Sequence, residues 1–233
     1  MKAFLIFCLG LAACSAQDDS GEQLSAADEA RASALLASYQ SARRDSNWEV
    51  AEAHADTLHA AFPSSEFAAK LAPTLDAVRE QANQRRDERR LRELWDYQAV
   101  PKGKGTQRTA TIYSRTPVVE EGELAIQPDA QLVLRDHPEW GRSAYLLFAQ
   151  SKFECGPPCR MDISFDGGAA QSFAGKQADS GKGPALFIED EARFIRQLSD
   201  AREVRIQLPK GSGSASSLVF EVSGFDAGRY EKP

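Results

Sequence analysis

Apolar side chains follow two different periods along the chain. Over residues 25–97 they recur every three or four positions, as on one face of an α-helix. Over residues 107–226 they alternate with polar side chains in short runs, as in half-buried β-strands. The sequence therefore predicts an α+β protein: a helical module at 25–97, a linker at 98–106, a β-domain at 107–226 and a tail at 227–233.

Two helices are expected to open the helical module. Ser25 is placed as the N-cap of the first, and the second is expected from Trp48 to Ala61. A further helix is expected to begin at Ser65. This helical hairpin resembles one tetratricopeptide-type unit, because Ala51, Ala55 and Pro63 stand where that repeat places its small residues and its closing proline. The resemblance implies contact with a peptide or a protein.

Five arginines lie between Arg85 and Arg92, in a stretch with almost no large apolar residue. We interpret this stretch as a solvated connecting helix, in which Glu88 and Arg92 form an i,i+4 pair. The alternative is that the arginines hold a phosphate group, for example of lipid A, or an acidic partner.

The β-domain is expected to be an antiparallel β-sandwich or barrel with one helix. The helix is expected to begin after Asp190 as N-cap and to end at Ala201. The expected strands are 109–114, 131–135, 144–153, 160–165, 185–188, 204–208 and 218–223.

Residues 95–226 resemble a class of bacterial envelope β-domains that includes the type VI secretion-associated VasI/TagO-like and the invasion-associated locus B-like proteins. The resemblance implies a small periplasmic β-domain and carries over no catalytic residue. It rests on Trp95-x-Tyr97, Phe153-x-Cys155, Cys159-x-Met161-x-Ile163-x-Phe165-Asp166 and Phe220-x-Val222-x-Gly224-Phe225.

The first residues are expected to direct the chain to a membrane. Lys2 and a nine-residue apolar stretch have the form of a signal peptide, residues 1–13. Leu11-Ala12-Ala13-Cys14 resembles a bacterial lipobox, which implies that Cys14 carries acyl chains such as palmitate. Ser15 at the next position favours the outer membrane. We therefore expect a lipid-anchored chain that faces the periplasm, with residues 14–24 as a flexible tether.

Cys155 and Cys159 are expected to form a structural disulfide bond, because the periplasm is oxidising. The alternative is a thiol–disulfide enzyme, since Cys-Gly-Pro-Pro-Cys differs by one proline from the thioredoxin-like motif. That chemistry needs two intervening residues before a helix, whereas here three intervene before a strand pattern. A metal site is not expected, because the chain has only three histidines.

No catalytic motif stands out in the sequence. Asp136-His137-Pro138-Glu139 is interpreted as a turn rather than an acid–base pair, and no cofactor is expected. The formal net charge of −6 argues against nucleic-acid binding. We therefore expect a non-enzymatic protein-interaction or assembly factor of the cell envelope. The alternative is a glycan- or ligand-binding module, with Trp140, Tyr145 or Tyr113 as stacking residues.

Overall fold

The computed structural model describes residues 24–115, 130–148, 155, 157–177, 184–208 and 217–230. The expected signal peptide, the lipidated Cys14 and nearly all of the tether lie outside these residues. The chain divides by its contacts into two units, Met1–Ala82 and Asn83–Pro233. The division falls inside a helix and not at the expected linker, so each unit is described by itself.

The first unit is helical, and its helices begin and end close to where the sequence places them. They are α1 (Ala26–Arg44), α2 (Trp48–Ala61), α3 (Glu66–Ala69) and the first half of α4 (Ala72–Glu93). The Ser25 hydroxyl oxygen accepts the N–H of Asp28 at 3.2 Å, as expected of an N-cap. The Ser65 hydroxyl oxygen accepts the N–H of Ala68 at 3.0 Å and starts α3 in the same way.

An apolar core holds these helices together. It is rich in alanine, which lets the helices approach closely. Two polar contacts fix the first half of α4 on the hairpin: the hydroxyls of Tyr39 and Thr74 lie 2.8 Å apart, and Arg79 donates to Asp56 at 2.8 Å. The core residues are Ala32, Leu36, Tyr39, Ala42, Ala51, Ala55, Leu58, Ala68, Leu71, Leu75 and Val78.

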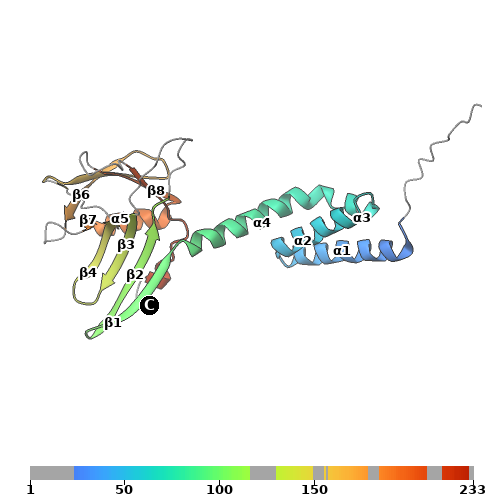
Figure 1. Cartoon of the computed structure of the whole chain (residues 1–233), viewed down its shortest axis with the longest axis horizontal. Helices are drawn as coiled ribbons and strands as arrows, with labels where there is room; N and C mark the ends of the chain where they lie inside the picture. The colour runs from blue at the N-terminus through green and yellow to red at the C-terminus, as the bar shows by residue number, and fades with distance from the viewer. Residues whose placement is uncertain are drawn as a thin grey trace, which may run out of the picture. The chain divides into compact units, whose positions relative to one another are not determined.

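The second unit is built on one antiparallel sheet of nine strands in the order β1-β2-β3-β4-β7-β6-β5-β8-β9. Figure 1 shows β1 to β4 side by side in chain order. The strands are β1 (Asp96–Lys102), β2 (Gly105–Tyr113), β3 (Ala130–His137), β4 (Gly141–Phe148), β5 (Arg160–Phe165), β6 (Gln171–Gln177), β7 (Ala185–Ile188), β8 (Glu203–Gln207) and β9 (Ser217–Glu221). Helix α5 (Glu191–Asp200) and the short α6 (Ala227–Tyr230) complete the unit.

The α+β class is confirmed, but the expected closed barrel is wrong for the part of the chain that the structure describes. Strand β6 pairs with both β5 and β7, so the strands form one continuous sheet and a sandwich of two separate sheets is not confirmed. One hydrogen bond, from the N–H of Arg115 to the carbonyl of Val219 at 2.7 Å, links the end of β2 to β9. A single core nevertheless joins both ends of the sheet to α5, whose Phe194, Ile195 and Leu198 are buried in it.

The expected linker at 98–106 is instead a β-hairpin of β1 and β2. Gly103, at φ 58°, and Lys104 form its two-residue turn between the paired Lys102 and Gly105. Glycines, lysines and a proline suggested a loop, but a tight hairpin needs the same residues. Strand β1 lies at the edge of the sheet. In an antiparallel hairpin, hydrogen-bonded and non-hydrogen-bonded residue pairs alternate. The main-chain groups of Pro101 therefore point toward the free edge of the sheet, where proline has no N–H to offer.

Candidate functional site

Strands β3 and β4 have one face in the core and one face away from it. Leu132, Leu134 and Leu146 belong to the core. The alternate residues of both strands therefore point to the opposite side of the sheet, which we call the outer face. On this face the register pairs Val133 with Tyr145, and Arg135 with Ser143.

A row of rings and one guanidinium group crosses the outer face. The rings of His137 and Trp140 stack with their centroids 3.9 Å apart. The Arg135 guanidinium lies 5.6 Å from the Trp140 ring and 5.5 Å from the Tyr145 ring. Tyr145 in turn lies 5.1 Å from Phe187 of β7. We call these five residues, His137, Trp140, Arg135, Tyr145 and Phe187, the aromatic–arginine ladder.

His137 shapes the turn that carries Trp140. Its Nδ1 accepts the backbone N–H groups of Glu139 at 3.1 Å and Trp140 at 3.3 Å. An acceptor at Nδ1 places the proton of the neutral ring on Nε2. His137 is only 2 % exposed, whereas Trp140 is 69 % exposed and covers it. The expectation that residues 136–139 serve a turn is consistent with this geometry.

Three donors of the outer face are buried and have no hydrogen-bond partner among the residues that the structure describes. They are Arg135 Nε, His137 Nε2 and the hydroxyl of Ser143. Arg135 and Ser143 stand directly opposite each other on neighbouring strands. A buried donor without an acceptor is costly, so such groups in a folded protein call for an explanation.

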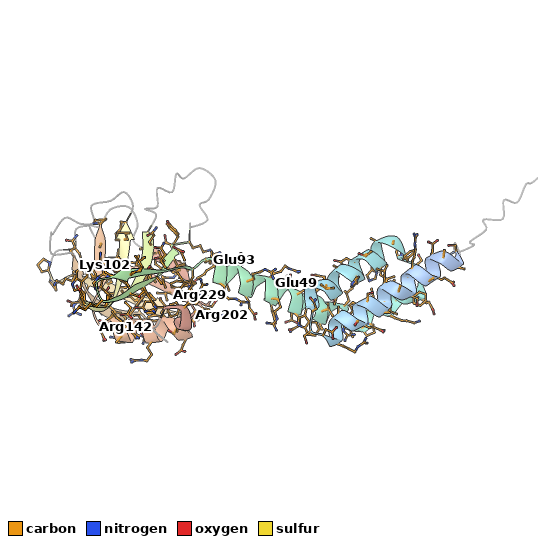
Figure 2. All side chains as sticks on the ribbon, turned by 90° about the horizontal axis from the view of Figure 1, so that it is seen from below. Glu49, Glu93, Lys102, Arg142, Arg202 and Arg229 are labelled. Carbon is orange, nitrogen blue, oxygen red and sulfur yellow. A yellow bond between two sulfur atoms is a disulfide. The ribbon has the colours of Figure 1, made fainter. Side chains whose placement is uncertain are left out.

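A hollow of about 370 Å³ adjoins the ladder at Ser143 and Phe187. Arg142 and Lys176 bring positive charge to it, while Glu189 and Glu191 bring negative charge. Arg142 is labelled in Figure 2, in the sheet unit. Burial raises the pKa of Tyr145 above its ordinary value, and the nearby charge of Arg135 opposes this shift.

The arginine-rich second half of α4 lines a larger cleft, of about 890 Å³, together with the chain that follows β9. Arg90 binds both carboxylate oxygens of Glu221, at 3.2 and 3.1 Å, and also contacts Asp87 at 2.9 Å. Hydrogen bonds to Glu221 and then to Asp87 raise the pKa of Arg90 above its ordinary value.

The expected ion pair between Glu88 and Arg92 is wrong. The Glu88 carboxylate instead accepts Arg85 at 3.2 Å, while Arg92 Nε donates to the main-chain carbonyl of Glu88 at 3.1 Å. Arg85, Arg90 and Arg92 thus each have a partner within the sheet unit. The alternative in which these arginines hold a phosphate gains no support from this pairing.

The end of α4 is locked to the chain after β9. A Cβ atom added at Gly224 would lie 2.1 Å from the main-chain oxygen of Leu91, so only glycine fits there. The Asp226 N–H donates to the Tyr97 hydroxyl at 2.6 Å, and Arg229 lies 4.3 Å from the Tyr97 ring. Burial raises the pKa of Tyr97. Figure 2 labels Arg229 in the sheet unit.

The sulfur atoms of Cys155 and Cys159 lie 1.96 Å apart, at disulfide-bonding distance. Both cysteines pack against the core of the sheet unit. A Cβ atom added at Gly175 of β6 would lie 2.8 Å from Cys159 Sγ, so this strand passes close to the pair. Gly156, between the cysteines, lies outside the described residues.

Of the three expected stacking residues, the structure brings two together. Trp140 and Tyr145 both flank Arg135, whereas Tyr113 is exposed on β2 and is not in the ladder. Arg135 and Ser143 were not singled out from the sequence. The signal that could have found them is the two-residue alternation of β3 and β4, once their register is known.

No family model, curated protein or solved structure matches the chain. Where the structure describes the chain, it shows no group of three or more His, Cys, Asp or Glu side chains placed to hold a metal ion. No helix in this part is both long and apolar enough to cross a bilayer.

Proposed function

We propose that this chain is a non-catalytic, lipid-anchored protein of the cell envelope that binds a partner protein through the outer face of its sheet. The aromatic–arginine ladder carries the proposal. Tryptophan, tyrosine and arginine are the residues that contribute most to protein–protein binding when they cluster. Here one of each meets in a single row, and the tryptophan is largely exposed.

The proposed location rests on the sequence. Leu11-Ala12-Ala13-Cys14 has the form of a lipobox, and Ser15 favours the outer membrane. A disulfide bond between Cys155 and Cys159 would persist in an oxidising compartment such as the periplasm. We propose that the helical unit is tetratricopeptide-like and adds a second surface for protein contact.

Lipid anchoring is tested by changing Cys14. The Cys14→Ser variant is expected to lose palmitate labelling and to leave the membrane fraction, because one modified cysteine holds the anchor. Cys8→Ser, a change inside the expected signal peptide, is the matched control and should leave both unchanged. Normal processing and membrane retention of the Cys14→Ser variant would contradict the anchor.

Partner binding is tested by cross-linking in cells followed by affinity purification. Trp140→Ala should remove the partner that the unaltered chain captures, because a central aromatic residue contributes about 2 kcal/mol or more to an interface. Tyr113→Ala is the control, since Tyr113 is equally exposed but lies outside the ladder. Equal capture by both variants would contradict binding at the ladder.

Glycan binding is the second candidate, and the hollow beside an exposed tryptophan favours it. Sugars stack on aromatic rings while their hydroxyl groups bond to polar side chains at the edge. Binding of purified envelope glycans to the chain, lost in Trp140→Ala, would favour this candidate over a protein partner.

A further inference from the structure

The guanidinium group of Arg135 lies beside aromatic rings and has no carboxylate partner among the residues that the structure describes. Two rings flank it, those of Trp140 and Tyr145 at 5.6 and 5.5 Å. It makes no ion pair or hydrogen bond with the described residues, and its Nε is buried. The rings favour the positive charge without forming an ion pair, so the guanidinium has no carboxylate partner among the described residues.

The neighbours of Arg135 on the outer face are also donors. The hydroxyl of Ser143, opposite Arg135 in the register, and Nε2 of His137, two residues along β3, lack partners among the described residues. Both atoms are buried donors, so among the described residues neither supplies Arg135 with an acceptor. The terminal nitrogens of an arginine can bind a carboxylate through two parallel hydrogen bonds.

We propose that Arg135 binds a carboxylate side chain of the partner protein, and that an apolar part of the same partner segment packs on Trp140. This inference rests on the proposed function, because it names the chemistry by which the ladder takes its partner. The carboxylate accepts hydrogen bonds from the two terminal nitrogens of Arg135, because Nε is the nitrogen of this side chain that is buried. The exposed face of Trp140 supplies the adjoining apolar contact.

Charge supports an acidic partner segment over a basic one. A basic segment would place a second positive charge beside Arg135, which has no carboxylate partner among the described side chains to offset it. Arg142 and Lys176 are two further cations at the adjoining hollow. The hollow also holds Glu189 and Glu191, so the carboxylate is placed at Arg135 and not in the hollow itself.

The test follows the Nε–H resonance of Arg135 in the full chain, labelled with ¹⁵N-arginine and dissolved in detergent. The probe is a blocked peptide with a Phe-Glu-Phe centre, and its control has Gln in place of Glu. The Glu peptide should shift this resonance saturably, and the Gln peptide should bind at least about tenfold more weakly, because charged hydrogen bonds are the stronger ones.

Variants then assign the effect to the named side chains. In Arg135→Gln, followed by tryptophan fluorescence, the Glu peptide should bind at least about tenfold more weakly. Ser143→Ala, which removes a buried hydroxyl, should bind the Glu peptide as the unaltered chain does. Arg196→Gln, which removes an exposed arginine of α5, should bind it as the unaltered chain does. Equal binding of the Glu and Gln peptides, or no saturable shift, would overturn the inference.

Two further outcomes separate this inference from the proposed function. If the captured partner depends on Trp140 but binds Arg135→Gln unchanged, carboxylate recognition fails and protein binding stands. If a glucuronate disaccharide shifts the Arg135 resonance at lower concentration than the Glu peptide does, the ligand is an acidic sugar and the protein partner is overturned.

Discussion

Arg90 and Arg135 belong to the same unit but are held in opposite ways. Arg90, on α4, binds both oxygens of Glu221 and also contacts Asp87. Arg135, on β3, has aromatic rings around it and no carboxylate among its described neighbours. The first charge is satisfied within the fold and therefore helps to hold α4 to the sheet. The second has ring contacts but no carboxylate partner among the described residues, which is why we propose that it serves a ligand.

The comparison also shows which of two clefts is the better candidate site, and it is not the larger one. The cleft beside α4 is larger, about 890 Å³ against about 370 Å³, and it contains more arginines. Two of those arginines, Arg85 and Arg92, nevertheless have partners within the unit. On the outer face near the smaller hollow, Arg135 Nε, His137 Nε2 and the Ser143 hydroxyl have no hydrogen-bond partner among the described residues. The state of the polar groups, and not the volume, identifies the better candidate site.

The largest effect is expected where α4 meets the chain after β9. Gly224→Ala should lower the free energy of unfolding of the sheet unit by about 3 kcal/mol, because the added methyl group meets main-chain atoms of Leu91 that cannot turn aside. Urea unfolding followed by circular dichroism measures it. Gly228→Ala is the control, since its nearest neighbour is a side-chain oxygen of Asp226 at 3.2 Å. A change as small as that of the control would contradict the close contact.

The next largest loss of stability is expected on removing the cysteine pair. A Cys155→Ser, Cys159→Ser double variant should fold and lose about 2 kcal/mol, as expected for a short loop closed by a structural disulfide. Binding at the ladder should change little, although Cys159 lies close to β6, which pairs with the strand of Phe187. A reduction midpoint between about −270 and −120 mV, with disulfide-exchange activity lost in the variant, would instead indicate a redox enzyme.

A third test compares the two arginines directly. Arg90→Met should lower the free energy of unfolding by about 1 kcal/mol, because it breaks a bidentate pair that is partly exposed. Arg135→Met should change it by less than about 0.5 kcal/mol, since losing the ring contacts is offset by removing an unsatisfied buried donor. Thermal unfolding of both variants measures the difference. A larger loss for Arg135 would mean that its role is structural.

The smallest expected effect is on the loss of folding stability at alkaline pH. Burial raises the pKa of Tyr97 above 10.0, so unfolded chains lose this proton at a lower pH than folded ones. Stability from this group is therefore full below pH 10 and falls as the pH rises through the folded pKa. Tyr97→Phe should flatten the loss of stability above pH 10, measured by urea unfolding from pH 8 to 11.5. Tyr145→Phe should act likewise, because burial raises that pKa too.

The local part of the fold could be predicted from the sequence. The bounds of α2, β5 and β7 are those expected, because caps, turns and alternation act over a few residues. Strands β1 and β6 were missed. The first holds Pro101 and reads as a loop, and the second contains Gly175 and only one large apolar side chain, Phe173.

The site could be predicted only in part. Trp140 and Tyr145 were named because large aromatic side chains near a turn suggest stacking. Arg135 was not named, because its role depends on its neighbours in the folded sheet. Ser143 stands opposite it on β4, and the turn after β3 brings the Trp140 ring back toward it. Those contacts depend on the pairing of strands, and the charge balance of a sheet face appears only once the register is known.

Pro101 in β1 bears on how the protein behaves when it is crowded. An edge strand with a full row of N–H groups invites another chain to add a strand, and sheets that grow in this way aggregate. Pro101 interrupts the row and Lys102 follows it with a charge. Molecules at high density would thus meet at an edge that is poorly suited to extending the sheet.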